Sequence, residues 1–155
     1  MSARRLVRVG VHLVWGTKHR IPWLDGAVRA RLDPLLRRTL IWKRCDPIAV
    51  GGWVDHVHVY ALLGPMTTLS ALVVALKSNS ARWIRESSPG LECFQWQRGY
   101  AAFGVDPRDD AALRAYIRDQ ELIHSMRAGV VSPMPQQPQR RAESLLEGRA
   151  YARPG

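Results

Sequence analysis

The amino-acid sequence predicts an α+β fold in which an antiparallel sheet of about four strands carries helices on one face, followed by a further C-terminal helix. Two observations lead to this fold. Apolar residues alternate along four short stretches and recur at helical spacing along three longer ones. The order is strand, helix, strand, strand, helix, strand, helix, which a ferredoxin-like or split βαβ arrangement accommodates with short connections.

The first half of the chain supplies one strand, one helix and a strand pair. Residues 6–15 alternate in polarity, as a half-buried strand does. Residues 25–43 have helical spacing, although Pro34 is expected to kink this helix or to mark a restart. Residues 48–54 and 53–63 follow as two strands joined by a tight connection, so they should pair antiparallel. The expected inward stripe of the helix is Val28, Leu32, Leu35, Leu36, Leu40 and Ile41.

The second half supplies two more helices and one more strand. A threonine or serine within residues 67–70 can cap a helix that runs over residues 69–86. Residues 101–105 form the fourth strand. A last helix is expected over residues 107–126, because Asp106 can cap it and a proline suits its first turn. Its expected inward stripe is Leu113, Tyr116, Ile117, Gln120, Ile123 and His124.

The composition predicts one globular domain at residues 1–128 and a basic, Pro-rich tail at residues 129–155, either disordered or docked on a partner subunit. No apolar stretch approaches the roughly 20 residues that span a bilayer, and residues 1–8 lack the apolar core of a signal peptide. We therefore expect a cytoplasmic protein with no membrane partner. Cys45 and Cys93 are too few and too far apart for a disulfide framework or a Cys-rich zinc site.

The net charge of +10, from 23 Lys and Arg against 13 Asp and Glu, favours a polyanionic partner. Nucleic acid is preferred over an acidic membrane because no basic amphipathic helix stands out. Lys18 and Arg20 lie in a loop between Trp15 and Trp23, a combination that suits single-stranded nucleic acid, where cations meet phosphates and bases stack on rings. A solvated loop anchored by two tryptophans is an equal alternative for this segment.

Two histidines stand out in the apolar run of the third strand. Side chains alternate along a strand, so His56 and His58 share one face, and Tyr60 shares it by the same parity. Two imidazoles on one face can hold one metal ion, although a pair of this kind is equally compatible with a hydrogen-bonded core histidine. In the last helix Tyr116 and Gln120 are four residues apart and share a face, where a buried amide needs a hydrogen-bond partner.

Five segments share the order and spacing of motifs in one known family. They are residues 11–18 (VHLVWGTK), 55–58 (DHVH), 76–83 (LKSNSARW), 96–103 (WQRGYAAF) and 116–120 (YIRDQ). Together they resemble the single-tyrosine transposases of bacterial insertion sequences, within the HUH nuclease superfamily. The resemblance extends over roughly residues 5 to 125.

The resemblance implies a mechanism and a set of site residues. His56, His58 and Gln120 would bind the catalytic divalent ion, Mg²⁺ or Mn²⁺, and Tyr116 would be the nucleophile. Attack by the tyrosine would give a 5′-phosphotyrosine link and free a 3′ hydroxyl, with no organic cofactor. Members of the family act on single-stranded DNA with hairpin-forming element ends. They work as homodimers in which the tyrosine helix can serve its own subunit or the other one.

Several roles follow as expectations or remain alternatives. His12 could contact DNA or the site, and His19 and His124 are expected at the surface. Tyr60 is a rival nucleophile on geometry, because it shares the histidine face. Alternative functions are a domesticated or inactive relative that binds structured single-stranded nucleic acid, and a zinc-binding structural domain. The residues expected to bind DNA are Lys18, Arg20, Lys77, Arg82 and Arg98.

Overall fold

The structure is a computed structural model and describes residues 6–128 of the chain, so the tail expected at 129–155 lies outside the described residues. The four strands are β1 (Gly10–Gly16), β2 (Asp46–Trp53), β3 (His56–Leu62) and β4 (Ala101–Val105). The four helices are α1 (Gly26–Trp42), α2 (Leu69–Ser87), α3 (Asp110–Arg118) and α4 (Gln120–Ala128). Two short 3-10 turns, η1 (Lys18–Arg20) and η2 (Pro107–Asp109), complete the order.

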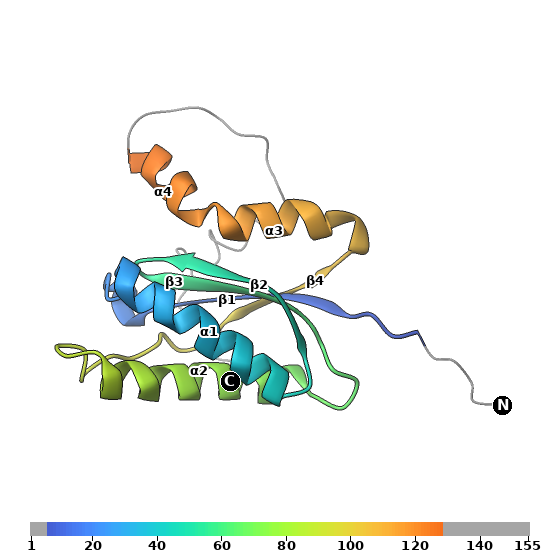
Figure 1. Cartoon of the computed structure of the whole chain (residues 1–155), viewed down its shortest axis with the longest axis horizontal. Helices are drawn as coiled ribbons and strands as arrows, with labels where there is room; N and C mark the ends of the chain where they lie inside the picture. Colours follow the sequence, from blue (N-terminus) through green and yellow to red (C-terminus); the bar gives the residue numbers. More distant parts are fainter. Residues whose placement is uncertain (1–5, 129–155) are drawn as a thin grey trace, which may run out of the picture.

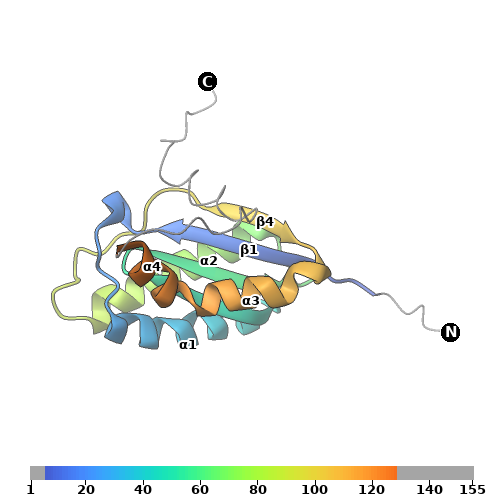
Figure 2. The same ribbon diagram turned by 90° about the horizontal axis from the view of Figure 1, so that it is seen from above.

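The strands form one antiparallel sheet in the order β2-β3-β1-β4. In Figure 1, α1 and α2 cover one face of this sheet, and α3 and α4 lie over the opposite face. Seen from above in Figure 2, α3 lies over the sheet roughly along the length of the strands, and α4 follows it. The predicted α+β fold is confirmed, and the predicted order of elements is confirmed as far as β4. None of the helices in residues 6–128 is long and apolar enough to cross a membrane.

The alternation of β3 divides its side chains between two cores. Val57, Val59 and Ala61 pack with β1 against α1 and α2 in the larger core. Tyr60 lies on the other face, in a smaller core with Leu113 and Ile117 of α3. The predicted parity of the histidine strand is therefore confirmed, and the histidine face is the one that the C-terminal helices cover.

In the first half of the chain the structure corrects two expectations, the start of the first strand and the orientation of Ile41, and it excludes a restart of the helix at Pro34. The first strand begins at Gly10, where its pairing with β3 and β4 begins, although the Val9 carbonyl before it still accepts a hydrogen bond from the Leu63 N–H at 2.8 Å. α1 continues without a restart through Pro34, whose missing hydrogen bond falls opposite the exposed residue Ala30, where water can serve the carbonyl. Ile41 is 61% exposed, because Leu40 takes the inward position at the end of the helix.

The last helix is also corrected, since it is two helices broken at Asp119. The backbone of Asp119 (φ −92°, ψ 16°) ends α3, and α4 starts at Gln120 with a change of direction (Figure 1). As predicted, Asp106 caps the first turn, accepting a hydrogen bond from the Arg108 N–H at 2.8 Å, and the capping residue of α2 is Thr68. The break brings Gln120 over the histidine face while Leu113 and Ile117 stay in the small core.

The sheet and α3 approach each other closely at Gly51 of β2. A Cβ atom at this position would lie 2.4 Å from the carbonyl oxygen of Ile117. Any side chain there would push α3 away from the sheet, so a glycine is required by the close approach of two backbones.

We predict that Gly51→Ala lowers the free energy of unfolding by about 1–3 kcal/mol, the usual cost of overpacking. Gly104→Ala in β4 is the matched control, because a Cβ at that position meets nothing within 4 Å. Urea unfolding of the two variants measures the difference. Equal stability of the two variants would contradict the close packing of α3 on β2.

Candidate active site

The site is built on β3, where His56 and His58 are both buried and point toward α3 and α4. Their ring centroids are 5.0 Å apart, with the rings nearly perpendicular. Because β3 is an inner strand with partners on both sides, its backbone fixes both side chains firmly. The two imidazoles therefore converge on one buried region.

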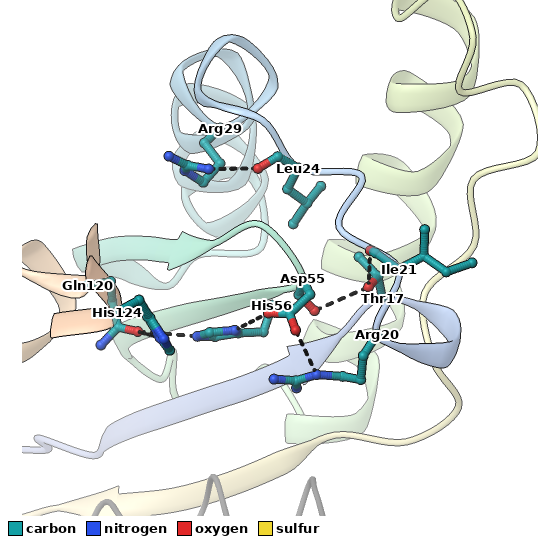
Figure 3. A network of polar contacts seen from close by, with 9 residues as sticks. All are labelled: Thr17, Arg20, Ile21, Leu24, Arg29, Asp55, His56, Gln120 and His124. Atoms are coloured by element: carbon teal, nitrogen blue, oxygen red, sulfur yellow. Dashed lines mark hydrogen bonds and ion pairs between the residues drawn. The ribbon is translucent and has the colours of Figure 1, made fainter. Parts of the chain in front are cut away.

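His56 is oriented by a chain of polar contacts that begins in the loop after β1. Its Nδ1 lies 2.8 Å from Oδ1 of Asp55, and Nε of Arg20 donates to Oδ2 of Asp55 at 3.0 Å (Figure 3). An ionised carboxylate can only accept, so His56 carries a proton on Nδ1. Burial acts to raise the pKa of Asp55, but hydrogen bonding to His56 and the charge of Arg20 bring it below its ordinary value. His56 Nε2 is thereby turned toward α4.

The Arg20 end of this chain depends on a tight turn at η1. His19 and Arg20 have φ values of 57° and 56°, a left-handed conformation that residues other than glycine seldom adopt. The hydroxyl of Thr17 donates to the Ile21 carbonyl at 2.7 Å and closes the turn. Local strain of this kind persists where surrounding contacts fix it, and here those contacts direct Arg20 onto Asp55.

Gln120 meets His56 from the start of α4. Its side chain is buried, its Nε2 donates to the Tyr116 carbonyl at 3.0 Å, and its Oε1 lies 3.2 Å from His56 Nε2. The bond to Tyr116 fixes which end of the amide faces the histidines. The buried amide on the expected inward stripe thus has the partner that its burial requires.

His124 also belongs to this cluster, so its expected place at the surface is wrong. It is half-buried, and its Nε2 lies 3.2 Å from Gln120 Oε1 (Figure 3). The His124 ring stacks on the Trp53 ring, with centroids 5.6 Å apart. The Arg29 guanidinium lies over the same Trp53 ring, 4.8 Å from its centroid. The spacing of four residues from Gln120 was the signal that could have placed His124 here.

His58 is fully enclosed and has a different partner. Its Nδ1 lies 2.9 Å from Nε2 of His12 on β1, and its Nε2 is buried with no hydrogen bond within residues 6–128. Burial, followed by the nearby imidazoles of His56, His12 and His124, holds the pKa of His58 well below its ordinary value. The side chain of Gln120 acts to raise the pKa of His58, but this is the smallest of the effects. No hydrogen bond of good geometry links Gln120 to His58 Nε2. His58 is therefore a neutral imidazole.

These atoms fit a divalent cation. With Nδ1 of His56 protonated, a neutral His56 presents a lone pair on Nε2 to the lone pairs of Gln120 Oε1 only 3.2 Å away, an arrangement that a cation would relieve. The unpaired His58 Nε2 offers a third donor. Among the described residues no group of three His, Cys, Asp or Glu side chains is placed to hold a metal ion. A metal site here would therefore need the amide oxygen of Gln120 beside the two imidazoles. Two imidazoles and one amide leave coordination positions open.

The two candidate nucleophiles have different surroundings. Tyr116 is half-buried on α3, and its ring meets the ring of His58 edge-on, with centroids 5.4 Å apart. The Tyr60 hydroxyl instead donates to Oδ1 of Asp110 at 2.8 Å, which anchors the start of α3 to the sheet. Burial, and then the bond to Asp110, raise the pKa of Tyr60. The environment thus favours Tyr116 over Tyr60 as a nucleophile.

The residues expected to bind DNA divide into two groups. Arg20 is held by Asp55, and the Lys77 ammonium donates to the carbonyls of Gln97 and Gly99 at 2.7 and 2.8 Å, so both have internal roles. Lys18 is exposed, although its ammonium donates to Gln95 Oε1 at 2.8 Å. The other two, Arg82 of α2 and Arg98 before β4, are exposed at the surface.

Comparison with solved structures identifies the class of the fold. A candidate transposase from Deinococcus radiodurans R1 aligns with a TM-score of 0.63 and 27% identity over 77% of this chain and 98% of that chain. A REP-associated tyrosine transposase bound to a REP hairpin aligns with a TM-score of 0.58 over 80% of this chain and 74% of that chain. At 16% identity the second likeness concerns the fold alone. The fold is one that transposases use.

Sequence comparison then gives the family. Residues 6–120 match the profile of the IS200-like transposases, and the chain belongs to that family. The transposases for insertion sequence element IS200 from Salmonella typhimurium LT2 and from Salmonella typhi are each 25% identical to it over 132 residues. The match covers 82% of this chain and 86% of each relative. The protein is thus a transposase, an enzyme that processes DNA.

The lowered pKa of His58 predicts that stability falls in mild acid. The folded state keeps His58 neutral, whereas the unfolded chain takes up a proton below about pH 6.5. The unfolded state then binds more protons, so the free energy of unfolding rises with pH and is lost as pH falls, by at most about 1.4 kcal/mol per pH unit for this group.

Urea unfolding at several pH values, with chelator present, measures this dependence. His58→Asn should show a shallower loss than the wild type below the ordinary imidazole pKa of about 6.5. His19→Asn is the control, since His19 is exposed and should leave the pH dependence unchanged. The same pH dependence in His58→Asn and the wild type would show that His58 does not contribute.

Proposed function

We propose that this transposase cleaves and rejoins single-stranded DNA at the ends of its insertion sequence, through a covalent 5′-phosphotyrosine link to Tyr116 and with a divalent metal ion, Mg²⁺ or Mn²⁺. The observation that carries the proposal is the edge-on contact of Tyr116 with His58, one of three side chains whose donor atoms fit a cation. A tyrosine beside such a donor set suits phosphoryl transfer by a phenol, because a cation close to a nucleophile helps to activate it.

The proposed ligands are His56 Nε2, His58 Nε2 and Gln120 Oε1. A cation bound by them would supply charge that polarises the scissile phosphate and offsets the negative charge of the transition state. Asp55 keeps the proton of His56 on Nδ1, and the Tyr116 carbonyl keeps the amide of Gln120 oriented. The protein would therefore offer its donors already oriented, with little rearrangement on binding.

The covalent step is a substitution at phosphorus. The Tyr116 hydroxyl releases its proton to solvent, its oxygen forms a bond to the phosphorus of the scissile phosphodiester, and the bond from phosphorus to the 3′ oxygen breaks. The departing 3′ oxygen takes up a proton and becomes a hydroxyl. The phosphodiester energy is kept in the tyrosine link, so a 3′ hydroxyl can attack that link and rejoin strands without an added energy source.

The proposed partner is single-stranded DNA with hairpin-forming ends. The net charge of +10 supports a polyanionic ligand, and the REP-associated relative with the same fold is bound to a hairpin.

We also propose that the protein acts as a homodimer. The packing of Leu113 and Ile117 on the sheet of the same chain supports an active site in which the tyrosine helix serves its own subunit.

We predict that Tyr116→Phe abolishes the covalent adduct while leaving DNA binding intact. The assay incubates the protein with single-stranded DNA carrying its own element end and with Mn²⁺, and detects the adduct by denaturing electrophoresis. Tyr60→Phe is the matched control and should retain the adduct, since its hydroxyl is bonded to Asp110. Chelation of the metal should suppress the adduct in every variant.

Two results would redirect this proposal. Equal adduct from the wild type and Tyr116→Phe would exclude Tyr116 as the nucleophile. Tight binding of the hairpin without any adduct in the wild type would favour the alternative function, a relative that binds structured single-stranded nucleic acid and does not mobilise an element.

The exposed basic residues predict a salt-dependent affinity. Each phosphate contact that is lost should reduce the slope of log affinity against log salt by about 0.7 for single strands. Replacing Arg82 and Arg98 with glutamine should lower this slope, and Arg38→Gln on the exposed side of α1 is the control. Filter binding at several salt concentrations measures it. An unchanged slope in the double variant would show that these two residues do not contact the DNA backbone.

A further inference from the structure

A buried pair of histidines, His12 and His58, joins β1 to the site. His12 is only 2% exposed, and its ring stacks on that of His58 with centroids 5.2 Å apart and planes 20° apart. The two atoms in contact are His12 Nε2 and His58 Nδ1, at 2.9 Å. His12 takes no part in the steps proposed above, yet it is enclosed against one of the proposed ligands.

One proton must lie between these two nitrogen atoms, and it can belong to either ring. If His12 donated it, a neutral His58 would carry its own proton on Nε2. That N–H would be buried without an acceptor, because Nε2 has no hydrogen bond among the described residues. Gln120 Oε1 already lies 3.2 Å from Nε2 of both His56 and His124. A buried donor without a partner is costly, typically about 1–3 kcal/mol.

If His58 donates the proton, the arrangement is satisfied. Nδ1 of His58 then gives its hydrogen to His12, and Nε2 is left as a lone pair directed into the site. His56 also has a lone pair on Nε2, because Asp55 holds the proton of His56 on Nδ1. Both strand histidines then present Nε2 lone pairs on the same side of the sheet.

We infer that His12 is a positioning residue, which accepts the Nδ1 hydrogen of His58 and thereby fixes the tautomer that directs the Nε2 lone pair into the site. An imidazole at this position accepts the hydrogen without placing a second carboxylate, in addition to that of Asp55, beside the buried histidines. The consequence for metal affinity rests on the proposed function, whereas the tautomer of His58 does not.

The tautomer is measured directly by ¹⁵N NMR of the full chain with labelled histidines, with chelator and at a pH well above the ordinary imidazole pKa of about 6.5. His58→Asn identifies the His58 signals. The wild type should show His58 protonated on Nδ1. In His12→Phe, which keeps a ring but no acceptor, the population protonated on Nε2 should rise, and His12→Gln, whose amide oxygen accepts, should restore the wild-type pattern.

A Mn²⁺ titration followed by electron paramagnetic resonance tests the consequence. His12→Phe should bind Mn²⁺ about 10- to 100-fold more weakly than the wild type, the usual effect of removing the partner of a ligand histidine. His12→Gln should bind nearly as well as the wild type, and His19→Gln, at an exposed position, should be unchanged. Circular dichroism verifies that each variant is folded.

Two outcomes would overturn the inference: His58 protonated on Nε2 in the wild type, which needs no variant to observe, or an unchanged tautomer in folded His12→Phe. Absence of Mn²⁺ binding by the wild type would instead count against the proposed metal site. In that case the tautomer measurement alone decides the role of His12, so the two failures are distinguishable.

Discussion

The burial of two imidazoles on one face of β3 is the constraint around which the site is arranged. Nitrogen atoms removed from water need partners, and each ring obtains one from a different part of the chain. Asp55 serves His56 from the turn before β3, and His12 serves His58 from the neighbouring strand β1. Gln120 meets His56 from α4. In the tautomers that we infer, the atoms left facing one another are lone-pair donors, and a divalent cation is the species that we propose to bind them together.

This arrangement requires the C-terminal helices to lie close to the sheet. Gly51 lets the backbone of α3 approach β2, and the hydroxyl of Tyr60 fixes the start of α3 through Asp110. Leu113 and Ile117 fill the space between these anchors. Tyr60, which lies on the histidine face of β3, thus anchors α3. Tyr116, one helical turn before Gln120, lies beside His58. The contacts that hold α3 on the sheet are therefore also the contacts that place Tyr116 beside His58.

Some basic side chains of this protein are bonded to other parts of the fold, whereas others are exposed at the surface. Arg20 and Lys77 are engaged by a carboxylate and by backbone carbonyls, so their charges stabilise the loops that surround the site. Arg82 and Arg98 are exposed, where they are accessible to phosphates. A basic residue in a motif can therefore also have a structural role, in which its cation binds the carbonyl or carboxylate oxygens of a loop.

The sequence by itself determined the order of the strands and helices, because hydrophobic period and capping residues are local properties. It also determined that His56 and His58 share a face, since strand parity depends only on sequence position. Only the tertiary structure decided the break at Asp119, the inclusion of His124 in the site, and the engagement of Arg20 and Lys77 within the fold. These depend on which atoms approach from elements far apart in the chain. An enclosed polar atom cannot bond to water, so it must find its hydrogen-bond partner within the fold.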